Sequence, residues 1–337
     1  MSFTTNKPVL CLGDTYIDVL IPFGELRTAA KNGEDTTPLS QPTHTLGGTI
    51  PNAARVFTSL GLQVFAATTI DNGRYGDYII TEFQKYGIRA DYVFRQAEPM
   101  TLILAVIDES GERTLFHYCG PDARLPSIID EIVEKVIPHL EDFGWLYFCG
   151  CSPGNTIAVA EAAKEKGVLV ALDLNLRIHR FGMNQERKEL ILRMIESADV
   201  ILGSGSKEFI PLTGLQDSDA AVKSLLEDNK VFVVRDGAEP VKIYRNDKII
   251  TVAPPQVNVI NTIGAGDSFS AAFVSALENG CSLTEAAEWG NNMAGWLIST
   301  SDRSVLPDKK KLLELVRQNT SKNSGAGKMM LTGTETA

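Results

Sequence analysis

The sequence predicts an α/β fold in which helices cover both faces of a mostly parallel sheet and a small separate β-sheet lies beside it. Two observations support this prediction. Short apolar runs alternate with amphipathic segments along most of the 337 residues, a rhythm typical of parallel strands joined by helices. Two segments, Ile17–Leu46 and Thr101–Tyr118, interrupt that rhythm.

The expected buried strands are rich in β-branched or aromatic side chains and have the lengths that strands usually have. They are Val9–Leu12, Leu62–Thr69, Gly144–Cys149, Val168–Leu174, Asp199–Leu202 and Val231–Val234. Between them, amphipathic helices are expected at Ile157–Lys166, Glu186–Ser197 and Asp219–Asp228.

The two interrupting segments predict a lid, formed by residues from about 16 to 46 and from about 99 to 120. The first contains three prolines and has no helical period, whereas the second indicates two strands around a turn at Asp108–Glu112. The alternative is that both are edge strands and loops of the main fold. We expect one domain over residues 1–320 that includes the lid. The Gly-, Ser- and Thr-rich tail over residues 321–337 is expected to be disordered.

Composition excludes several classes of function. The formal net charge of −10 argues against nucleic-acid binding, for which a basic stripe is expected. No apolar run is long enough to span a membrane, and the N-terminus lacks a signal-peptide core, so a cytoplasmic protein is expected. The five cysteines are expected to be reduced, and Cys149-Gly-Cys151 has no second Cys or His pair at metal-ligand spacing.

The most informative motif is Asn261-Thr-Ile-Gly-Ala-Gly-Asp-Ser-Phe269, which leads directly into a helical pattern that ends at Gly280. Gly264, Ala265 and Gly266 therefore fall at a helix N-terminus, where unpaired N–H groups favour an anion. Asp267 beside them either caps the helix or acts as a base. Phosphoryl transfer needs an anion site and a base placed together, which favours the second role.

Two further motifs are candidates for ligand binding. Gly47 and Gly48 precede a helix that begins near Pro51 and Asn52, and they would let a ligand approach the backbone. The segment from Gly13 to Asp18 follows the first strand, at the end of the sheet where ligands bind in open α/β folds. Taken alone, each motif is equally compatible with an ordinary turn.

Together these residues resemble the ribokinase-like (PfkB) family of carbohydrate kinases, over nearly the whole chain to about Pro307. The likeness rests on two signatures in this order, GGTIPNAARVFTSLG from Gly47 and NTIGAGDSF from Asn261. It implies a three-layer α/β/α sandwich with a β-sheet lid over a sugar substrate. It also implies phosphorylation of that sugar by ATP with Mg²⁺.

The resemblance also implies roles for individual residues. Asp267 would deprotonate the sugar hydroxyl, and the three residues from Gly264 to Gly266 would form the anion hole for the γ-phosphate. The residues expected to bind the sugar are Asp14, Asp18, Gly47, Gly48, Asn52 and Arg177. Those expected on the nucleotide side are Asp173, Asn175, Lys207, Arg235, Gly237 and Asn292. Glu208 matches the glutamate that organises Mg²⁺ through water.

Three positions depart from the family pattern. Asn261 stands where an Asp is usual, and that Asp often serves a monovalent-cation site, so the use of K⁺ is left open. Gly205 stands where an Asn usually precedes the glutamate. Arg235 stands where a Thr or Ser is common, and it would reach a nucleotide phosphate. None of these changes removes the base or the anion hole, so an active enzyme is expected.

The substrate is expected to be that of a fructokinase or a 2-keto-3-deoxygluconate kinase, which the Asp173-Leu-Asn-Leu-Arg177 segment resembles most. Arg177, with Tyr118 or Arg124, would then face a sugar-acid carboxylate. A nucleoside kinase of the same family, a catalytically silent sugar-binding regulator and a dinucleotide-dependent oxidoreductase are the alternatives. An exposed lid sheet tends to be covered by a partner, which predicts a homodimer through the lid.

Overall fold

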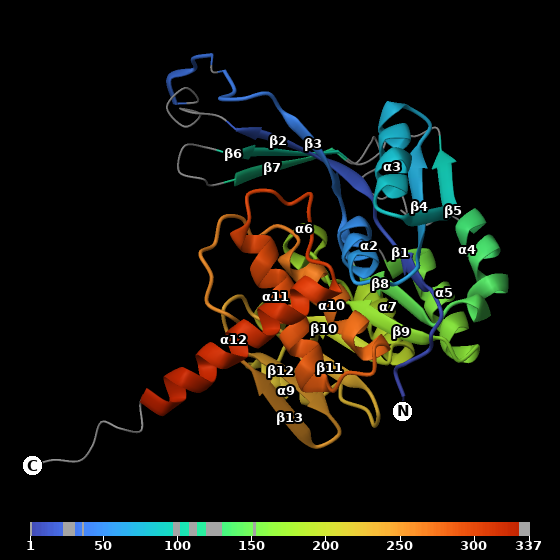
Figure 1. Ribbon diagram of the computed structural model, residues 1–337. Coiled ribbons are helices and arrows are strands. Elements are labelled where there is room, and N and C mark those ends of the chain that lie inside the picture. The colour runs from blue at the N-terminus through green and yellow to red at the C-terminus, as the bar shows by residue number, and fades with distance from the viewer. Residues whose placement is uncertain are drawn as a thin grey trace, which may run out of the picture.

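The structure is a computed structural model that describes residues 2–22, 31–35, 37–96, 102–107, 113–118, 130–150 and 153–329 (Figure 1). Its centre is a nine-stranded sheet with the strand order β13-β12-β11-β10-β9-β8-β1-β4-β5. The strands are β1 (Val9–Leu12), β4 (Val64–Asp71), β5 (Ile88–Gln96), β8 (Trp145–Cys149), β9 (Leu169–Asp173), β10 (Val200–Gly203), β11 (Val231–Val234), β12 (Val241–Arg245) and β13 (Lys248–Val252). Neighbours from β5 to β11 pair in parallel, and β12 and β13 are antiparallel.

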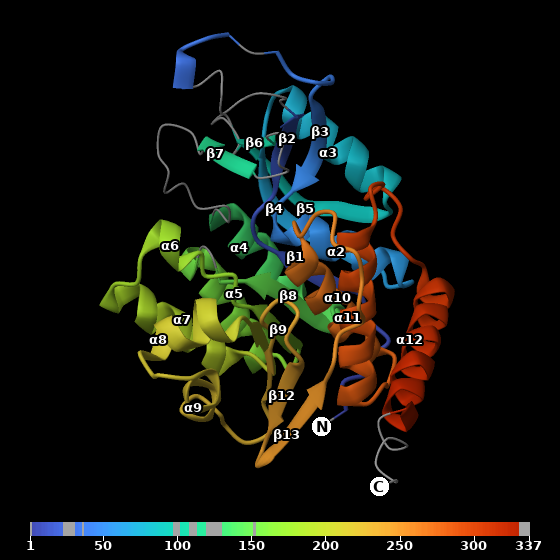
Figure 2. The ribbon, with the colours of Figure 1, turned by 90° about the vertical axis from the view of Figure 1, so that its left-hand side faces the viewer.

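Helices cover both faces of this sheet, and alternate residues of a single strand point into the two layers. In β1, Val9 and Cys11 join one hydrophobic cluster, whereas Leu10 and Leu12 join the other. Figure 2 shows the sheet between the two helical layers. The three-layer α/β/α prediction is therefore confirmed, and the burial of both faces explains why the central strands are continuous apolar runs.

Each layer consists of helices whose apolar side chains lie in one of the two clusters. The first layer holds α2 (Thr49–Ser59), α3 (Arg74–Lys85), α10 (Ala265–Glu278), α11 (Leu283–Ser299) and α12 (Lys309–Met329). The second holds α4 (Asp130–Val136), η1 (Ile137–Asp142), α5 (Pro153–Glu165), α6 (Ile178–Phe181), α7 (Gln185–Ser197), η2 (Gly205–Phe209), α8 (Ile210–Thr213) and α9 (Ser218–Lys223).

A second sheet stands apart from the central one, as the lid prediction requires. Its order is β3-β2-β6-β7, with β2 (Tyr16–Pro22), β3 (Thr43–Gly47), β6 (Leu102–Ile107) and β7 (Arg113–Tyr118). Strands β2 and β6 are parallel, and the other pairs are antiparallel. In Figure 1 this sheet projects from the body at the upper left. The turn expected at Asp108–Glu112 lies outside the described residues.

Most element boundaries agree with the sequence to within about two residues, the usual uncertainty of helix and strand ends. Strands β5, β12 and β13 were not expected, and α9 ends at Lys223, earlier than the predicted Asp228. Helix α12 continues to Met329, so part of the tail for which we expected no regular structure is helical, and residues 330–337 lie outside the described residues. Within the described part of the chain, no helix is long and apolar enough to cross a membrane.

Candidate active site

The proposed anion hole lies at the first turn of α10. The helix is preceded by Gly264, whose φ of 70° is in the left-handed region that favours glycine. Residues Ala265, Gly266 and Asp267 form the first turn, where backbone N–H groups point away from the helix. The Ala265 N–H makes a long bond of 3.3 Å to the Thr262 carbonyl. The turn therefore presents both a partial positive charge and a carboxylate.

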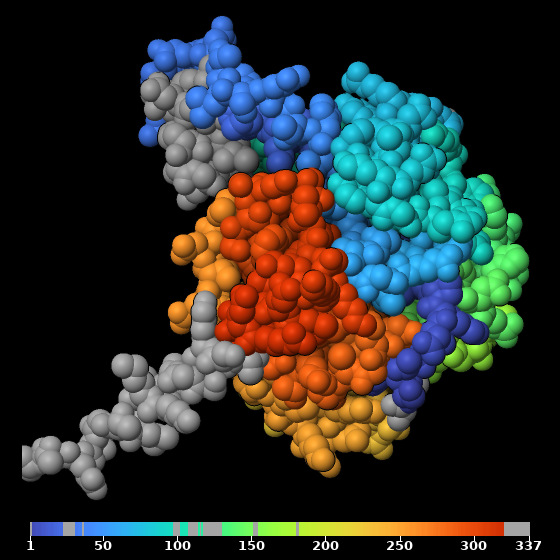
Figure 3. Space-filling view, in the orientation of Figure 1, coloured from blue at the N-terminus to red at the C-terminus, as the bar shows by residue number. Residues whose placement is uncertain are grey.

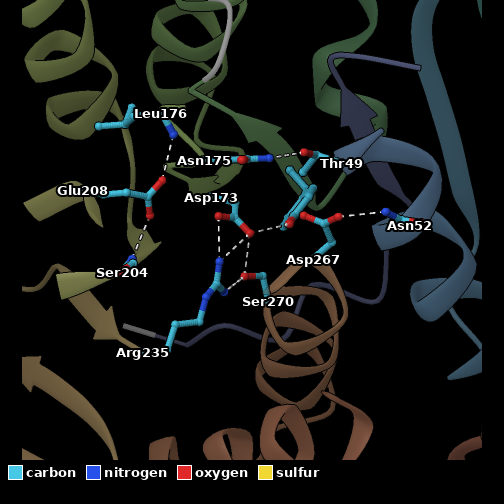
Figure 4. Close-up of polar contacts among 11 residues, drawn as sticks. Thr49, Asn52, Asp173, Asn175, Leu176, Ser204, Glu208, Arg235, Asp267 and Ser270 are labelled. Atoms are coloured by element: carbon cyan, nitrogen blue, oxygen red, sulfur yellow. Dashed lines mark hydrogen bonds and ion pairs between the residues drawn. The ribbon is translucent and has the colours of Figure 1, made fainter. Parts of the chain in front are cut away.

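Asp267 is hydrogen-bonded to Asn52, a residue that the sequence predicts on the sugar side. Its Oδ2 accepts a hydrogen bond of 2.8 Å from Asn52 Nδ2 on α2 (Figure 4). The carboxylate keeps some exposure to solvent, yet burial among protein atoms raises its pKa to about 7, and the charge of Asp173 raises it further. Asn52 opposes this rise. Asp267 thus has the pKa of a group that can accept a proton near neutral pH.

The two glycines before α2 are required by what touches them. A Cβ on Gly47 would lie 2.5 Å from Asp18 Oδ1, and one on Gly48 would lie 2.5 Å from the Asp14 carbonyl oxygen. Gly48 also has a φ of 104°. These contacts bring the lid strand β2, the loop after β1 and the start of α2 together, and sugar binding by these residues stays a prediction.

Asp18 faces the same region from the lid. Burial raises its pKa to about 6, and the positive charges of Arg303 and Arg177 oppose that rise. Arg177 likewise lowers the pKa of Asp267. Arg177 is exposed and precedes α6 with a left-handed φ of 49°. The positive charge of Arg177 therefore acts on both carboxylates and favours the ionised form of each.

Asp173 and Arg235 form a buried ion pair behind the anion hole. Arg235 Nη2 donates to both carboxylate oxygens of Asp173, at 2.8 and 3.0 Å. Ser270 Oγ and the Tyr147 hydroxyl also donate to Asp173, at 2.8 and 3.2 Å. A Cβ on Gly266 would lie 3.3 Å from Arg235 Nη2. Asp173 therefore holds the Arg235 guanidinium beside the anion hole, and its place on the nucleotide side stays a prediction.

Glu208 ties together two loops at the carboxyl ends of the strands. Its carboxylate oxygens accept backbone N–H bonds of 2.7 Å from Leu176 and from Ser204. Burial, followed by the charge of Asp173, raises its pKa. Asn175, the residue before Leu176, has a left-handed φ of 36°. Its side-chain amide donates a hydrogen bond to Thr49 Oγ1 on α2. Among the described residues, no group of three or more His, Cys, Asp or Glu side chains could hold a metal ion by itself.

The structure describes three more of the residues that are predicted to lie on the nucleotide side. Lys207 is exposed on η2, and its backbone N–H donates to Ser204 Oγ. Gly237 has a φ of 60° with open space where a side chain would be, so backbone conformation explains this glycine. Asn292 donates to the Glu288 carbonyl and accepts from Asn319 Nδ2, which links α11 to α12.

Close contacts explain why a glycine, and not the asparagine usual in the family, stands at position 205. A Cβ there would lie 2.6 Å from Asp236 Oδ2 and 2.7 Å from Ser218 Cβ. The Asp236 carboxylate instead accepts bonds from Ser204 Oγ and from the Ser206 N–H. A larger residue at position 205 would have to displace that carboxylate. Cys151, the second member of the Cys-Gly-Cys motif, lies outside the described residues.

Sequence reasoning missed three side chains that the structure brings to this region: Arg303, Thr49 and Ser270. Ser270 lies one turn after Gly266 and Asp267, so its position on α10 was a usable signal. Arg303 follows α11 in a segment with no motif of its own, and the sequence contained no signal for it.

Comparisons with known proteins bear on the family and the fold of this chain. The family model described as pfkB family carbohydrate kinase matches residues 6–309. The 5-dehydro-2-deoxygluconokinase of Clostridium perfringens is 23% identical, with 89% of this chain and 93% of the relative covered. The probable fructokinase-5 of Arabidopsis thaliana is 25% identical, with 90% and 94% covered. In fold, the Arabidopsis thaliana ribokinase complexed with ribose and ATP matches with a TM-score of 0.75 at 22% identity, covering 94% of this chain and 99% of its own.

Proposed function

Because this chain belongs to the pfkB family of carbohydrate kinases, we propose that it transfers the γ-phosphoryl group of ATP to a hydroxyl of a small sugar or sugar acid in the cytoplasm. The favoured substrate is that of a fructokinase or a 2-keto-3-deoxygluconate kinase. The observation that carries this proposal is the bond between Asn52 and Asp267, because it joins a sugar-side residue to a carboxylate at a helix N-terminus.

Asp267 is the base in this proposal. Its carboxylate accepts the proton of the sugar hydroxyl while that oxygen attacks the γ-phosphorus in line with the leaving group. Its pKa of about 7 suits a base that must be ionised yet still hold the proton it takes. The first-turn N–H groups of α10 and the guanidinium of Arg235 offset charge on the transferring group.

The sugar lies between the lid and α2. Asp18 accepts hydrogen bonds from sugar hydroxyls, Asn52 offers a donor and an acceptor, and Gly47 and Gly48 leave room at the backbone. Asp14, in the loop after β1, belongs to the same wall. The exposed Arg177 meets a carboxylate where the substrate is a sugar acid. The names of the two relatives, a 5-dehydro-2-deoxygluconokinase and a probable fructokinase, support this substrate class.

Mg²⁺ arrives with the ATP in this proposal and neutralises phosphate charge when bound. Such ions are held by one or two carboxylates together with phosphates and waters. The buried Glu208 fits a role through water, since its oxygens already accept two backbone N–H bonds. Asn175, Lys207, Gly237 and Asn292 are proposed to line the nucleotide side, and the lid is proposed to form a homodimer interface.

The test is a panel of sugars, sugar acids and nucleosides with MgATP, read out as ADP release by the wild type and Asp267→Asn. We expect turnover with at least one ketose or keto acid, and a loss of about 10³-fold in kcat for the variant, the usual contribution of general-base catalysis. Asp247→Asn, in the exposed turn between β12 and β13, is the matched control. Near-wild-type turnover by Asp267→Asn would refute the assigned base, and sugar binding without any turnover would indicate a silent regulator.

Thermal melting gives a second readout of the same variant. The folded-state pKa of Asp267 is raised, so its contribution to stability is present below pH 4 and is lost as pH rises through about 7. The neutral amide of Asp267→Asn avoids this loss. The variant should therefore melt higher than the wild type at pH 8, by at least about 2 °C, with a smaller difference at pH 5. An equal or lower melting temperature at pH 8 would contradict the burial of this charge.

A further inference from the structure

A fixed positive charge lies directly behind the anion hole. Arg303 Nη2 donates a hydrogen bond to the backbone carbonyl of Ile263, the residue before Gly264. A Cβ built on Gly264 would lie 3.4 Å from Arg303 Nη2 and 3.3 Å from Asn52 Nδ2. The guanidinium therefore touches the turn that opens α10, on the side that Asn52 also contacts.

Both peptide groups that flank the Cα of Ile263 are held by hydrogen bonds. The Ile263 N–H donates to Asn261 Oδ1 at 2.9 Å, and the Ile263 carbonyl accepts from Arg303. The loop is fastened to the end of α11 as well, because the Ile260 and Asn261 N–H groups both donate to the Ile298 carbonyl. The direction of the Ile263 carbonyl is thus fixed before any ligand binds.

Arg303 itself is held in place from α2. Arg55 Nη2 donates to the Arg303 carbonyl at 2.6 Å, and the Arg55 guanidinium lies 4.4 Å from the centre of the Tyr86 ring. The following residue is pinned by the bond from the Ser304 N–H to Asp302 Oδ1 at 3.0 Å. These contacts order the segment that presents the guanidinium to the loop.

The residues at this loop do not fit a monovalent-cation site of the kind that the family resemblance implies. The Ile263 carbonyl oxygen, a group that could bind a cation, already accepts a hydrogen bond from the Arg303 guanidinium. Asn261 supplies a neutral amide where a carboxylate would attract K⁺. A second cation at the same carbonyl would be repelled by the first at short range.

We propose that Arg303 takes the place of a monovalent cation in this enzyme, so that the anion hole is ordered without K⁺ or Na⁺. Arg303 is a positioning residue: it orients the Ile263–Gly264 turn and adds a positive charge behind the site of phosphate binding. This proposal rests on the proposed kinase function.

The same guanidinium reaches the sugar side of the site. Burial raises the pKa of Asp18, and the positive charge of Arg303 opposes that rise more strongly than the charge of Arg177 does. Loss of Arg303 should therefore weaken the ionised form of Asp18 as well as the order of the anion hole. A change in the pH dependence of sugar binding would accompany the loss in rate.

The experiment compares chloride salts of K⁺, Na⁺ and tetramethylammonium at equal ionic strength. We expect the wild-type kcat to agree within about two-fold in all three, since surface screening is matched. Arg303→Ala should lose about 10- to 100-fold in tetramethylammonium chloride, less than the cost of removing a direct oxyanion donor. Millimolar K⁺ or guanidinium should restore part of that loss, and Arg303→Lys should keep an intermediate rate without responding to salt.

Arg193→Ala, which removes a surface ion pair with Glu161, is the control and should match the wild type in every salt. The change in melting temperature on adding MgADP, measured in each salt, supplies a readout that does not require turnover. If no sugar is phosphorylated but this shift is the same in all salts, the kinase proposal fails, whereas nucleotide binding that needs no monovalent cation is retained.

Three results would overturn the role of Arg303. One is a wild-type kcat or MgADP shift that increases several-fold with K⁺. Another is wild-type kcat in Arg303→Ala without added cation. The third is a folded Arg303→Ala that loses activity and recovers with neither K⁺ nor guanidinium. Should Arg303→Ala fail to fold, the wild-type salt profile and Arg303→Lys decide the question.

Discussion

At the scale of single residues, two carboxylates at the site hold their protons more tightly than ordinary aspartates. Burial raises the pKa of Asp267 to about 7 and that of Asp18 to about 6. If Asp267 is the base, kcat/KM for the sugar should rise with pH and level off above about pH 7, because only the ionised form accepts a proton. Below about pH 6 the decline should steepen, since protonated Asp18 no longer accepts two hydroxyl bonds.

The check is a pH–rate profile from pH 5 to 9 at saturating MgATP, for the wild type and Asp18→Asn. The variant should bind sugar less tightly but keep the change of slope near pH 7, because Asp267 is intact. A profile that is flat between pH 6 and 8 would contradict the assignment of Asp267 as the base.

Gly47 tests the contact between the lid and α2. A Cβ there would lie 2.5 Å from Asp18 Oδ1 and 2.6 Å from Asp18 Cγ, so Gly47→Ala must displace the carboxylate. Displacement of this size costs about 1–3 kcal/mol, so KM for the sugar should rise about ten-fold or more, at about 1.4 kcal/mol per decade. Steady-state kinetics with varied sugar measure it, with Thr43→Ala on the same strand as the control. An unchanged KM would show that Asp18 does not contact the sugar.

At the scale of elements, the sequence predicted those strands whose neighbours cover both faces. Strands β1, β8, β9, β10 and β11 are buried along their whole length, so each is a continuous apolar run. Strand β5 instead lies at the sheet edge and carries Arg89 and Arg95, and β13, at the other edge, is mostly exposed. Exposed charges break the apolar pattern on which strand prediction depends, and these strands were missed for that reason.

The candidate site likewise has a part that local sequence motifs predict and a part that they do not. Helix starts and glycine turns leave a local signature, and so the Gly264–Asp267 turn and the Gly47–Asn52 segment were found from sequence. Their bond joins residues 215 positions apart, and the contact of Arg303 with Ile263 spans 40 positions. No local pattern encodes such pairs. Asp173 shows the consequence, since its motif predicted a nucleotide-side residue but could not predict its ion pair with Arg235, which lies 62 positions away.

At the scale of the whole molecule, the lid has two unlike faces. Residues paired across its strands share a face, so Val19, Leu104 and Phe116 lie together, opposite the face that carries Asp18. Val19 is buried, Leu104 is half-buried and Phe116 on the edge strand β7 is 55% exposed. Figure 3 shows lid residues projecting beyond the rest of the body. An apolar face on a projecting sheet is a surface that a second copy of the lid would cover.

We therefore expect a homodimer that depends on this face. The wild type should have the mass of a dimer in light scattering at about 10 μM, well above the dissociation constant of a specific interface. Phe116→Glu should shift the mass toward a monomer, because a buried carboxylate without a partner is strongly unfavourable. Ile249→Glu, at an exposed position on β13, should leave the dimer intact. A monomeric wild type, or equal masses for wild type and Phe116→Glu, would contradict assembly through the lid, because no other change separates these two proteins.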